Sequence, residues 1–268
     1  MNRVIVTAVL AATTALVAPA AFAGNTNCPV SQAALASALA NAVAQNNGGL
    51  QLNMWATVVN REGRVCAVAY SGANFQSQWP GSRAISAQKA STANDFNLGP
   101  NSNASGHGGF GVAGLALSTA NLYSAVQPGG SLYGLQHSNP VDTRDAYEGE
   151  ADDFGTYDDP MVGKRVGGVN VFGGGLGLYA HDHSVVGGVG VSGDTSCTDH
   201  EIAWRVRNAL GFDHLKGVNG VSGDPTHPDN IIYDIKPNPN GGTGVSAGGF
   251  GHPTCINTAD QTKLPPVE

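Results

Sequence analysis

The sequence predicts an α/β domain of the α+β type, because hairpins and helices follow one another in alternating blocks without the regular rhythm of a doubly wound sheet. Two pairs of short apolar segments have the spacing of hairpins, and segments with helical periodicity lie on either side of each pair. The chain also carries 38 glycines and 14 prolines, which favour short elements joined by long turns. Charged residues make up only 12% of the chain and hydrophobic residues 41%, which argues against general disorder.

The first 23 residues have the order of a signal peptide. Arg3 precedes an apolar run over residues 4–17, and the small residues Ala21 and Ala23 stand at the positions that a signal peptidase reads. The run is too short to span a bilayer, and no other segment approaches the roughly 20 apolar residues that a span needs. We therefore expect cleavage after Ala23, a periplasmic or extracellular protein, and no membrane span.

The charge of the chain limits its partners. The net charge is −7, and removal of Arg3 with the signal peptide makes it −8. An acidic chain with few aromatic residues lacks the basic surface that nucleic acid or anionic lipid would need. We therefore expect no nucleic-acid partner.

A first helix is expected over residues 29–46. Leu35, Leu39 and Val43 recur at intervals of four and so share one face. Ser31 is a good residue for the N-cap.

Two hairpins are expected. The first joins strands at residues 54–59 and 65–70 through a turn of ordinary length. The second joins strands at 176–180 and 185–192 through the turn His181-Asp182-His183-Ser184.

Three further helices are expected. One over residues 82–96 follows the first hairpin, one over 113–126 follows a Gly/Asn/Ser-rich stretch, and a final one begins near Asp199. Thr198 and Glu201 have the spacing of a capping box, which accounts for Glu201 without any catalytic role.

The chain divides into the signal peptide (1–23), a domain over 24–210 and an irregular extension over 211–268. The domain carries an insertion at 127–165 with eight acidic residues. Their spacing does not match an EF-hand loop, so a solvated acidic insertion is favoured over a calcium site. The extension is expected to lie over the domain as a tail.

Four cysteines in an exported chain favour two disulfides over free thiols. Of the three possible pairings we predict Cys28–Cys66 and Cys197–Cys255. The first would tie the first helix to the neighbouring hairpin, and the second would anchor the tail.

Residues 55–94 combine two strands with a helix that contains Lys89-Ala90-Ser91-Thr92-Ala93, and residues 174–193 read GGLGLYAHDHSVVGGVGVSG. In this order, both segments resemble the GlcG/HbpS-like haem-binding family, whose helix carries Lys-Ala-x-Thr-Ala and whose second hairpin is rich in glycine. The chain departs from the family at Gly177, where a proline is usual, and at the turn 181–183, where Asp-Gly is usual.

The resemblance implies a central antiparallel sheet of about five strands flanked by helices. It also implies a haem or other tetrapyrrole ligand and assembly into a homo-oligomer. The chain has no C-x-x-C-H motif, so covalent attachment of a c-type haem is excluded.

Candidate iron ligands lie in the altered turn. His181 and His183 are two residues apart, a spacing that points both side chains to one face of an extended segment. Neutral imidazole binds haem iron or a metal ion, although a solvent-facing polar turn also explains each histidine. Tyr179 is a candidate for apolar cover over the ligand.

Candidate anion-binding groups lie in the family motifs. Lys89 could pair with a ligand carboxylate, with Asp95 or with a sheet-edge carbonyl. Ser192 and Gly193 end a strand before a helix, where N–H groups can bind an anion; the alternative is that the glycine only permits a tight turn. The Asp213-His214 pair is of a kind too common to indicate catalysis.

Three functions are compatible with these features. The first, which we favour, is an exported haem or tetrapyrrole binder for storage, sensing or transfer. The second is a haem-degrading enzyme, although the sequence assigns it no base, redox partner or catalytic residue. The third is a structural or interaction module of an oligomeric assembly whose pocket has been lost.

Overall fold

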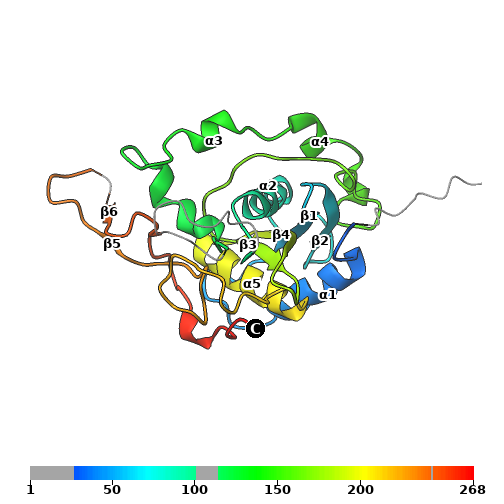
Figure 1. The fold of residues 1–268 in the computed structure, drawn as a ribbon. Helices are drawn as coiled ribbons and strands as arrows, with labels where there is room; N and C mark the ends of the chain where they lie inside the picture. The colour runs from blue at the N-terminus through cyan, green and yellow to red at the C-terminus, as the bar shows by residue number, and fades with distance from the viewer. Residues whose placement is uncertain (1–26, 101–113, 243) are drawn as a thin grey trace, which may run out of the picture.

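The computed structural model of the protein describes residues 27–100, 114–242 and 244–268. The expected signal peptide and most of the Gly/Asn/Ser-rich stretch lie outside the described residues. Within them, a four-stranded antiparallel sheet in the order β2-β1-β4-β3 forms the centre (Figure 1). The strands are β1 (Trp55–Asn60), β2 (Val65–Tyr70), β3 (Gly175–Tyr179) and β4 (Val185–Ser192). The predicted fold class is confirmed, with four strands where about five were expected.

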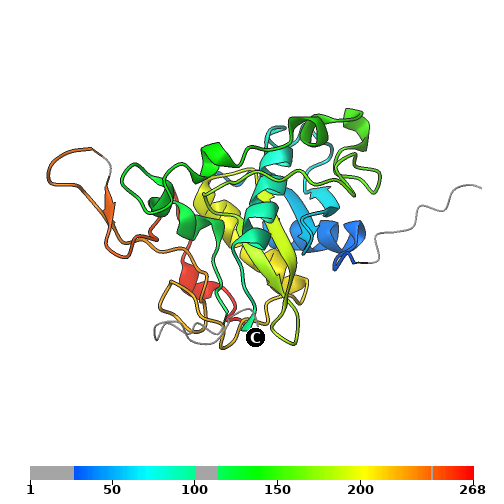
Figure 2. The same ribbon diagram turned by 45° about the horizontal axis from the view of Figure 1, so that its top comes forward.

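Helices cover both faces of this sheet. α2 (Ser82–Asp95) crosses one face, and α1 (Gln32–Val43) and α5 (Ser196–Ala209) pack on the other (Figures 1 and 2). The side chains of β1 alternate accordingly: Ala56 and Val58 belong to the core beside α1 and α5, and Trp55 to the core beside α2. Every residue of β1 is buried, because the strand lies between two layers of helices.

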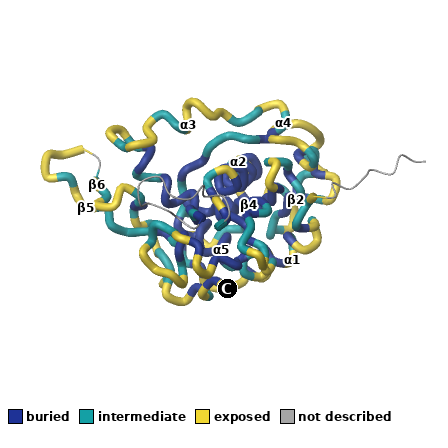
Figure 3. Tube along the Cα trace, viewed as in Figure 1, coloured by how far each residue is buried: buried dark blue, intermediate teal, exposed yellow. Residues whose placement is uncertain are grey.

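α2 lies close to the sheet because glycines of β4 leave room for it. A Cβ atom on Gly190 would lie 2.0 Å from the Ser86 carbonyl oxygen, and one on Gly188 would lie 2.3 Å from the Ala90 carbonyl oxygen. The helix itself is rich in small residues and is buried on nearly all sides (Figure 3). The glycine-rich hairpin therefore serves as a packing surface for α2.

The helix starts agree with expectation in one case and differ in another. Ser31 caps α1 by accepting a backbone N–H of the first turn. α5 begins at Ser196, and its N-cap is Thr195, whose hydroxyl accepts the N–H of Thr198. The predicted capping box of Thr198 and Glu201 is therefore wrong, because both residues lie inside the helix.

The α-helix expected over 113–126 is also wrong. The described part of this segment forms two 3₁₀ turns, Thr119–Leu122 and Ser124–Val126. Just before them, the Ala116 N–H donates to the Asn219 carbonyl oxygen at 2.8 Å. Pairing with the C-terminal extension thus uses backbone groups that an α-helix would have needed.

The acidic insertion forms a docked layer over α2 and is not simply solvated. It contains α3 (Leu135–Ser138) and α4 (Thr143–Tyr147), which run above α2 in Figure 1. Most of its acids are exposed, but Asp159 is buried and accepts a hydrogen bond from Arg83 Nε at 2.9 Å. Because Arg83 belongs to α2 and is itself buried, this ion pair anchors the insertion to the helix.

The C-terminal extension is irregular, as expected, but it also completes the core. Its ribbon of β5 (Ile235–Lys236) and β6 (Val245–Ser246) projects at the left of Figure 1. Leu215 and Leu264 are buried in the same core as α1 and α5. The extension is therefore part of the folded domain.

Two disulfides join Cys28 to Cys66 and Cys197 to Cys255, which is the predicted pairing. The first ties the segment before α1 to β2, and the second ties the extension to α5. Among the described residues, no helix is long and apolar enough to cross a membrane.

Candidate functional site

Histidine and carboxylate side chains gather where the β3–β4 turn meets the C-terminal extension. This histidine–carboxylate cluster consists of His181, His183, Asp213, His214 and Glu268. The extension reaches the turn because residues 212–214 run beside the end of β3. There the Tyr179 N–H donates to the Phe212 carbonyl oxygen at 2.8 Å.

The two histidines that the sequence singled out do not share one face. Residues 181–184 form a turn, and His183 has a φ of +62°, so the period of two that holds for extended backbone does not apply. The ring of the exposed His181 lies against that of His214, with 3.8 Å between the ring centroids and 39° between the ring planes. His183 Nδ1 lies 2.9 Å from the His214 carbonyl oxygen. Both histidines therefore meet at His214.

His214 is one of eight histidines that the sequence offers as possible iron ligands, and the sequence analysis did not single it out. It is only 7% exposed, and its Nε2 is buried without a hydrogen-bond partner in the described part of the chain. Its Nδ1 lies 3.5 Å from Glu268 Oε2. Asp213 is also buried, and its carboxylate accepts a hydrogen bond from Asn208 Nδ2 at 2.7 Å. An Asp-His pair is visible in the sequence, but only the path of the extension places it against His181.

Lys89 faces a carboxylate that the protein itself supplies. Its fully buried Nζ donates to Asp199 Oδ2 at 2.6 Å and to the Val191 carbonyl oxygen of β4 at 2.9 Å. Burial lowers the pKa of Lys89, and the ion pair with Asp199 opposes that shift. The sequence analysis expected a ligand carboxylate, Asp95 or a sheet-edge carbonyl as the partner of this ammonium group. The carbonyl that it contacts belongs to β4, an inner strand of the sheet, and Asp199 was not among the expected partners.

The strand–helix junction at Ser192 and Gly193 also holds the carboxylate of Asp199. The N–H groups of Gly193 and Asp194 donate to Asp199 Oδ1 at 3.1 and 2.9 Å. Ser192 Oγ lies 3.3 Å from Ser82 Oγ. Burial raises the pKa of Asp199 to about 6, although its pairing with Lys89 opposes the shift. The anion at this junction is therefore part of the fold.

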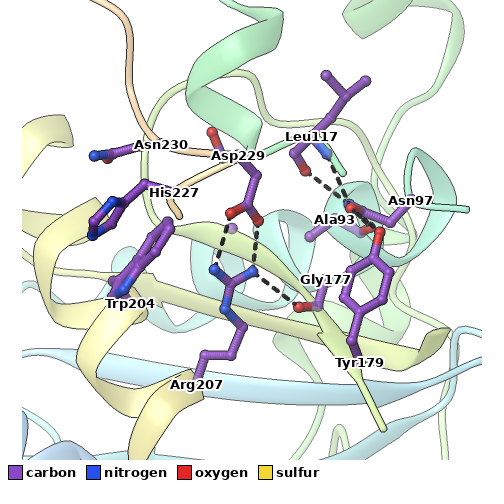
Figure 4. Close-up of polar contacts among 12 residues, drawn as sticks. Ala93, Asn97, Leu117, Gly177, Tyr179, Trp204, Arg207, His227, Asp229 and Asn230 are labelled. Carbon is purple, nitrogen blue, oxygen red and sulfur yellow. Dashed lines mark hydrogen bonds and ion pairs between the residues drawn. The ribbon is translucent and has the colours of Figure 1, made fainter. Parts of the chain in front are cut away.

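Tyr179 lies in a buried polar network and offers no exposed face (Figure 4). Its hydroxyl donates to Asn97 Oδ1 at 2.9 Å, and Asn97 Nδ2 donates to the Ala93 and Leu117 carbonyl oxygens. Burial raises the pKa of Tyr179 far above its usual value. In a single chain this side chain therefore holds the end of β3 in place.

A second part of the same network joins α5 to the extension. Arg207 donates to both carboxylate oxygens of Asp229, at 2.5 and 2.9 Å, and to the Gly177 carbonyl oxygen at 3.3 Å (Figure 4). Both charged side chains are fully buried. The ion pair thus fixes the extension against β3 at the position where the family pattern has proline.

Among the surface cavities that the described residues form, three have volumes of about 500, 540 and 630 Å³. Two are neighbours at the C-terminal end of α1, and the third lies over α4. Their walls are mainly polar, and none includes a residue of the histidine–carboxylate cluster. Because a haem site needs apolar walls, none of the three suits a flat apolar ligand.

The cluster combines an exposed imidazole, a buried imidazole whose Nε2 has no hydrogen-bond partner among the described residues, and carboxylates. Nitrogen and oxygen donors of this kind bind metal ions, including haem iron.

The chain matches a family model described as haem-degrading protein HbpS-like, over residues 31–207. The match includes the whole central sheet and ends inside α5, before the extension. No curated protein sequence matches the chain significantly.

Several solved structures align with the chain. Protein ORFY of Klebsiella pneumoniae is 24% identical, over 68% of this chain and 90% of that one, with a TM-score of 0.42. A complex of PduOC with haem is 21% identical, over 66% and 89% of the chains, with a TM-score of 0.42. A double mutant of HbpS from Streptomyces reticuli is 15% identical, over 77% and 99% of the chains, with a TM-score of 0.38.

Proposed function

Because the chain belongs to the HbpS-like haem-degrading family, we propose that it binds haem, or a closely related tetrapyrrole, without covalent attachment. The family match over residues 31–207 carries this proposal, since it spans all the strands of the central sheet. All four cysteines are held in disulfides, so none is available to attach a haem vinyl group.

His181 or His183 is the proposed iron ligand. A neutral imidazole is a good ligand for haem iron, and the ring of His181 is exposed. His183 Nδ1 faces a carbonyl oxygen, which leaves Nε2 to bind iron. Among the described residues Asp182 makes no hydrogen bond to either ring; its Oδ1 accepts the Ser184 N–H and hydroxyl, at 3.0 and 2.6 Å.

The surroundings of the turn supply part of what a haem needs. Leu98 is 37% exposed, and the neighbouring Gly99 lies against the His183 carbonyl group. Phe212 is half-buried beside the end of β3, and the exposed Lys216 could pair with a propionate. Bound haem would supply an iron centre, and the turn would supply its imidazole ligand. The described residues of one chain do not enclose such a ligand, so we propose that a second copy covers it.

The test is a titration of haemin into the untagged mature protein, followed through the Soret band. We expect a saturable change in the wild type. In the double variant His181→Ala/His183→Ala we expect a different Soret position and an affinity at least about tenfold weaker, because an iron ligand has been lost. The single variant His137→Ala removes an exposed histidine outside the cluster and should behave as the wild type.

Two outcomes would contradict the proposal at different levels. If the double variant keeps the Soret position and affinity of the wild type, these histidines are not the ligands. If the wild type itself shows no saturable change, haem binding fails and the structural or interaction module takes its place. Addition of a reductant to the loaded protein then separates storage, sensing or transfer, in which the Soret band persists, from haem degradation, in which it disappears as a product forms.

Export is a further part of the proposed function. The order of residues 1–23 and the two disulfides both support it, since disulfides persist in oxidising compartments outside the cytosol. Mass spectrometry of the exported protein should find Gly24 as its first residue, and a chain that keeps Met1 would contradict processing.

A further inference from the structure

Three side chains of the extension, Asp213, His214 and Glu268, each place one donor atom within 4.8 Å of the others. We propose that they form a binding site for a divalent transition-metal ion of the Zn²⁺ class, with His181 as the fourth ligand. The site goes beyond haem binding and does not depend on it, because three of its ligands lie outside the residues that the family model matches.

The state of His214 is the main observation behind the site. Buried polar groups in proteins nearly always have hydrogen-bond partners. The ring of His214 makes no hydrogen bond within the described residues, although the residue is 7% exposed and its Nε2 is buried. Its Nδ1 faces the Glu268 carboxylate at 3.5 Å, beyond hydrogen-bond distance for a pair of this kind. A cation bound at Nδ1, the ring nitrogen that faces Glu268, would give this buried imidazole the close partner that a contact of 3.5 Å does not supply.

The ligands divide into a fixed half and an adjustable half. Asp213 and His214 are buried, and the hydrogen bond from Asn208 holds one carboxylate oxygen of Asp213 in place. Glu268 has a side chain that is 68% exposed, and His181 is exposed as well. Ligand atoms around a tetrahedral Zn²⁺ lie about 3.3 Å apart. The two exposed side chains can close on the ion without a change in the core.

The donor set selects the kind of metal. One or two imidazoles with two carboxylates suit Zn²⁺ and its neighbours in the first transition row, whereas Ca²⁺ and Mg²⁺ prefer sites made of oxygen alone. The two carboxylates together carry two negative charges, which balance the two positive charges of a divalent ion.

One other group of metal-binding side chains occurs among the described residues, and it sets a condition for the experiment. Cys197, His252 and Cys255 lie equally close together, but the two sulfur atoms are joined in a disulfide and cannot bind an ion as thiolates. The protein must therefore be kept free of reductant, so that this group does not contribute.

The experiment is a calorimetric titration of Zn²⁺ alone into untagged, haem-free protein that has been treated with a chelator. We expect one saturable site per chain with Zn²⁺ and none with Ca²⁺. His214→Ala should weaken Zn²⁺ binding more than about 100-fold, because loss of even an outer partner of a metal ligand costs about 10- to 100-fold. Glu268→Gln removes one charge from an exposed side chain without altering the core, and it should weaken binding at least about tenfold.

Matched controls separate the site from adventitious binding and from haem binding. His137→Ala removes an exposed histidine outside the cluster and should leave the Zn²⁺ affinity unchanged. If the wild type shows no saturable Zn²⁺ binding, the proposed site is wrong. It is also wrong if Glu268→Gln and a folded His214→Ala variant both bind Zn²⁺ as tightly as the wild type. A haemin titration of the same sample measures haem binding on its own. A Soret change without Zn²⁺ binding would therefore reject the metal site and leave the proposed haem binding in place.

Discussion

Glu201 of α5 is an acid that lies buried in the protein. Neither of its carboxylate oxygens has a hydrogen-bond partner in the described part of the chain, and the residue is fully buried. Burial raises the pKa of Glu201 to about 7, the nearby Arg205 opposes this shift, and Asp260 of the extension adds to it. The folded protein therefore holds a proton at Glu201 that the unfolded chain, with an ordinary pKa of 4.5, has released at pH 6.

This difference makes stability depend on pH with a definite sign. Between pH 4.5 and about 7 the folded state binds more protons than the unfolded state, so this residue's contribution to the free energy of unfolding falls as the pH rises. In Glu201→Gln the neutral amide keeps the shape of the protonated acid and removes the titration. The variant should gain stability relative to the wild type as the pH rises from 5 to 8, by up to about 3 kcal/mol.

Denaturant unfolding at several pH values measures this difference directly. Glu150→Gln, which removes an exposed acid of the insertion, is the matched control and should show no such gain. A stability difference between Glu201→Gln and wild type that stays constant from pH 5 to pH 8 would show that Glu201 does not titrate in this range. Comparison with the wild type at each pH also cancels the opposing titration of His200 and His252, whose pKa values burial lowers to about 4.

At the scale of elements, the contact between α2 and β4 determines how closely the two layers pack. Gly190→Ala would place a methyl group about 2.0 Å from the Ser86 carbonyl oxygen, so the helix or the strand must move. Insertion of an extra methyl group into a packed core costs about 1–3 kcal/mol. We expect a loss of at least that size in the free energy of unfolding. Gly248→Ala in the ribbon is the control, because its Cβ would meet only an ordinary contact at 3.5 Å. Equal stability of the two variants would contradict this role of the β4 glycines.

At the scale of the molecule, the described residues of one chain leave the proposed ligand uncovered. The three cavities are mainly polar, and the histidine–carboxylate cluster lies outside all of them. Since a haem needs apolar cover on both faces, we predict that the mature protein self-associates. Light scattering at micromolar protein should give at least twice the mass of one processed chain, with and without haemin. A monomeric mass under both conditions would contradict the prediction.

The sequence by itself determined the parts of this protein that depend on short stretches of chain. The two hairpins follow from paired apolar segments separated by turn residues, and α1 with its Ser31 cap follows from apolar residues at intervals of four. The place of α2 directly after the first hairpin was also predicted. The number of cysteines reduced the disulfides to three pairings, and the predicted one is present. The family resemblance also lay in contiguous motifs, which is why it could be stated from the chain alone.

The tertiary structure decided the contacts between residues far apart in sequence. Lys89 meets Asp199 across 110 residues, and Arg83 meets Asp159 across 76. Neither pair leaves a local pattern, because each partner is simply a charged residue in its own segment. The same holds for His214, which becomes a candidate ligand only where the extension passes the β3–β4 turn. Local patterns fix which elements form, whereas burial and pairing across the chain decide which polar side chains are left without a partner and so remain able to bind an ion or ligand.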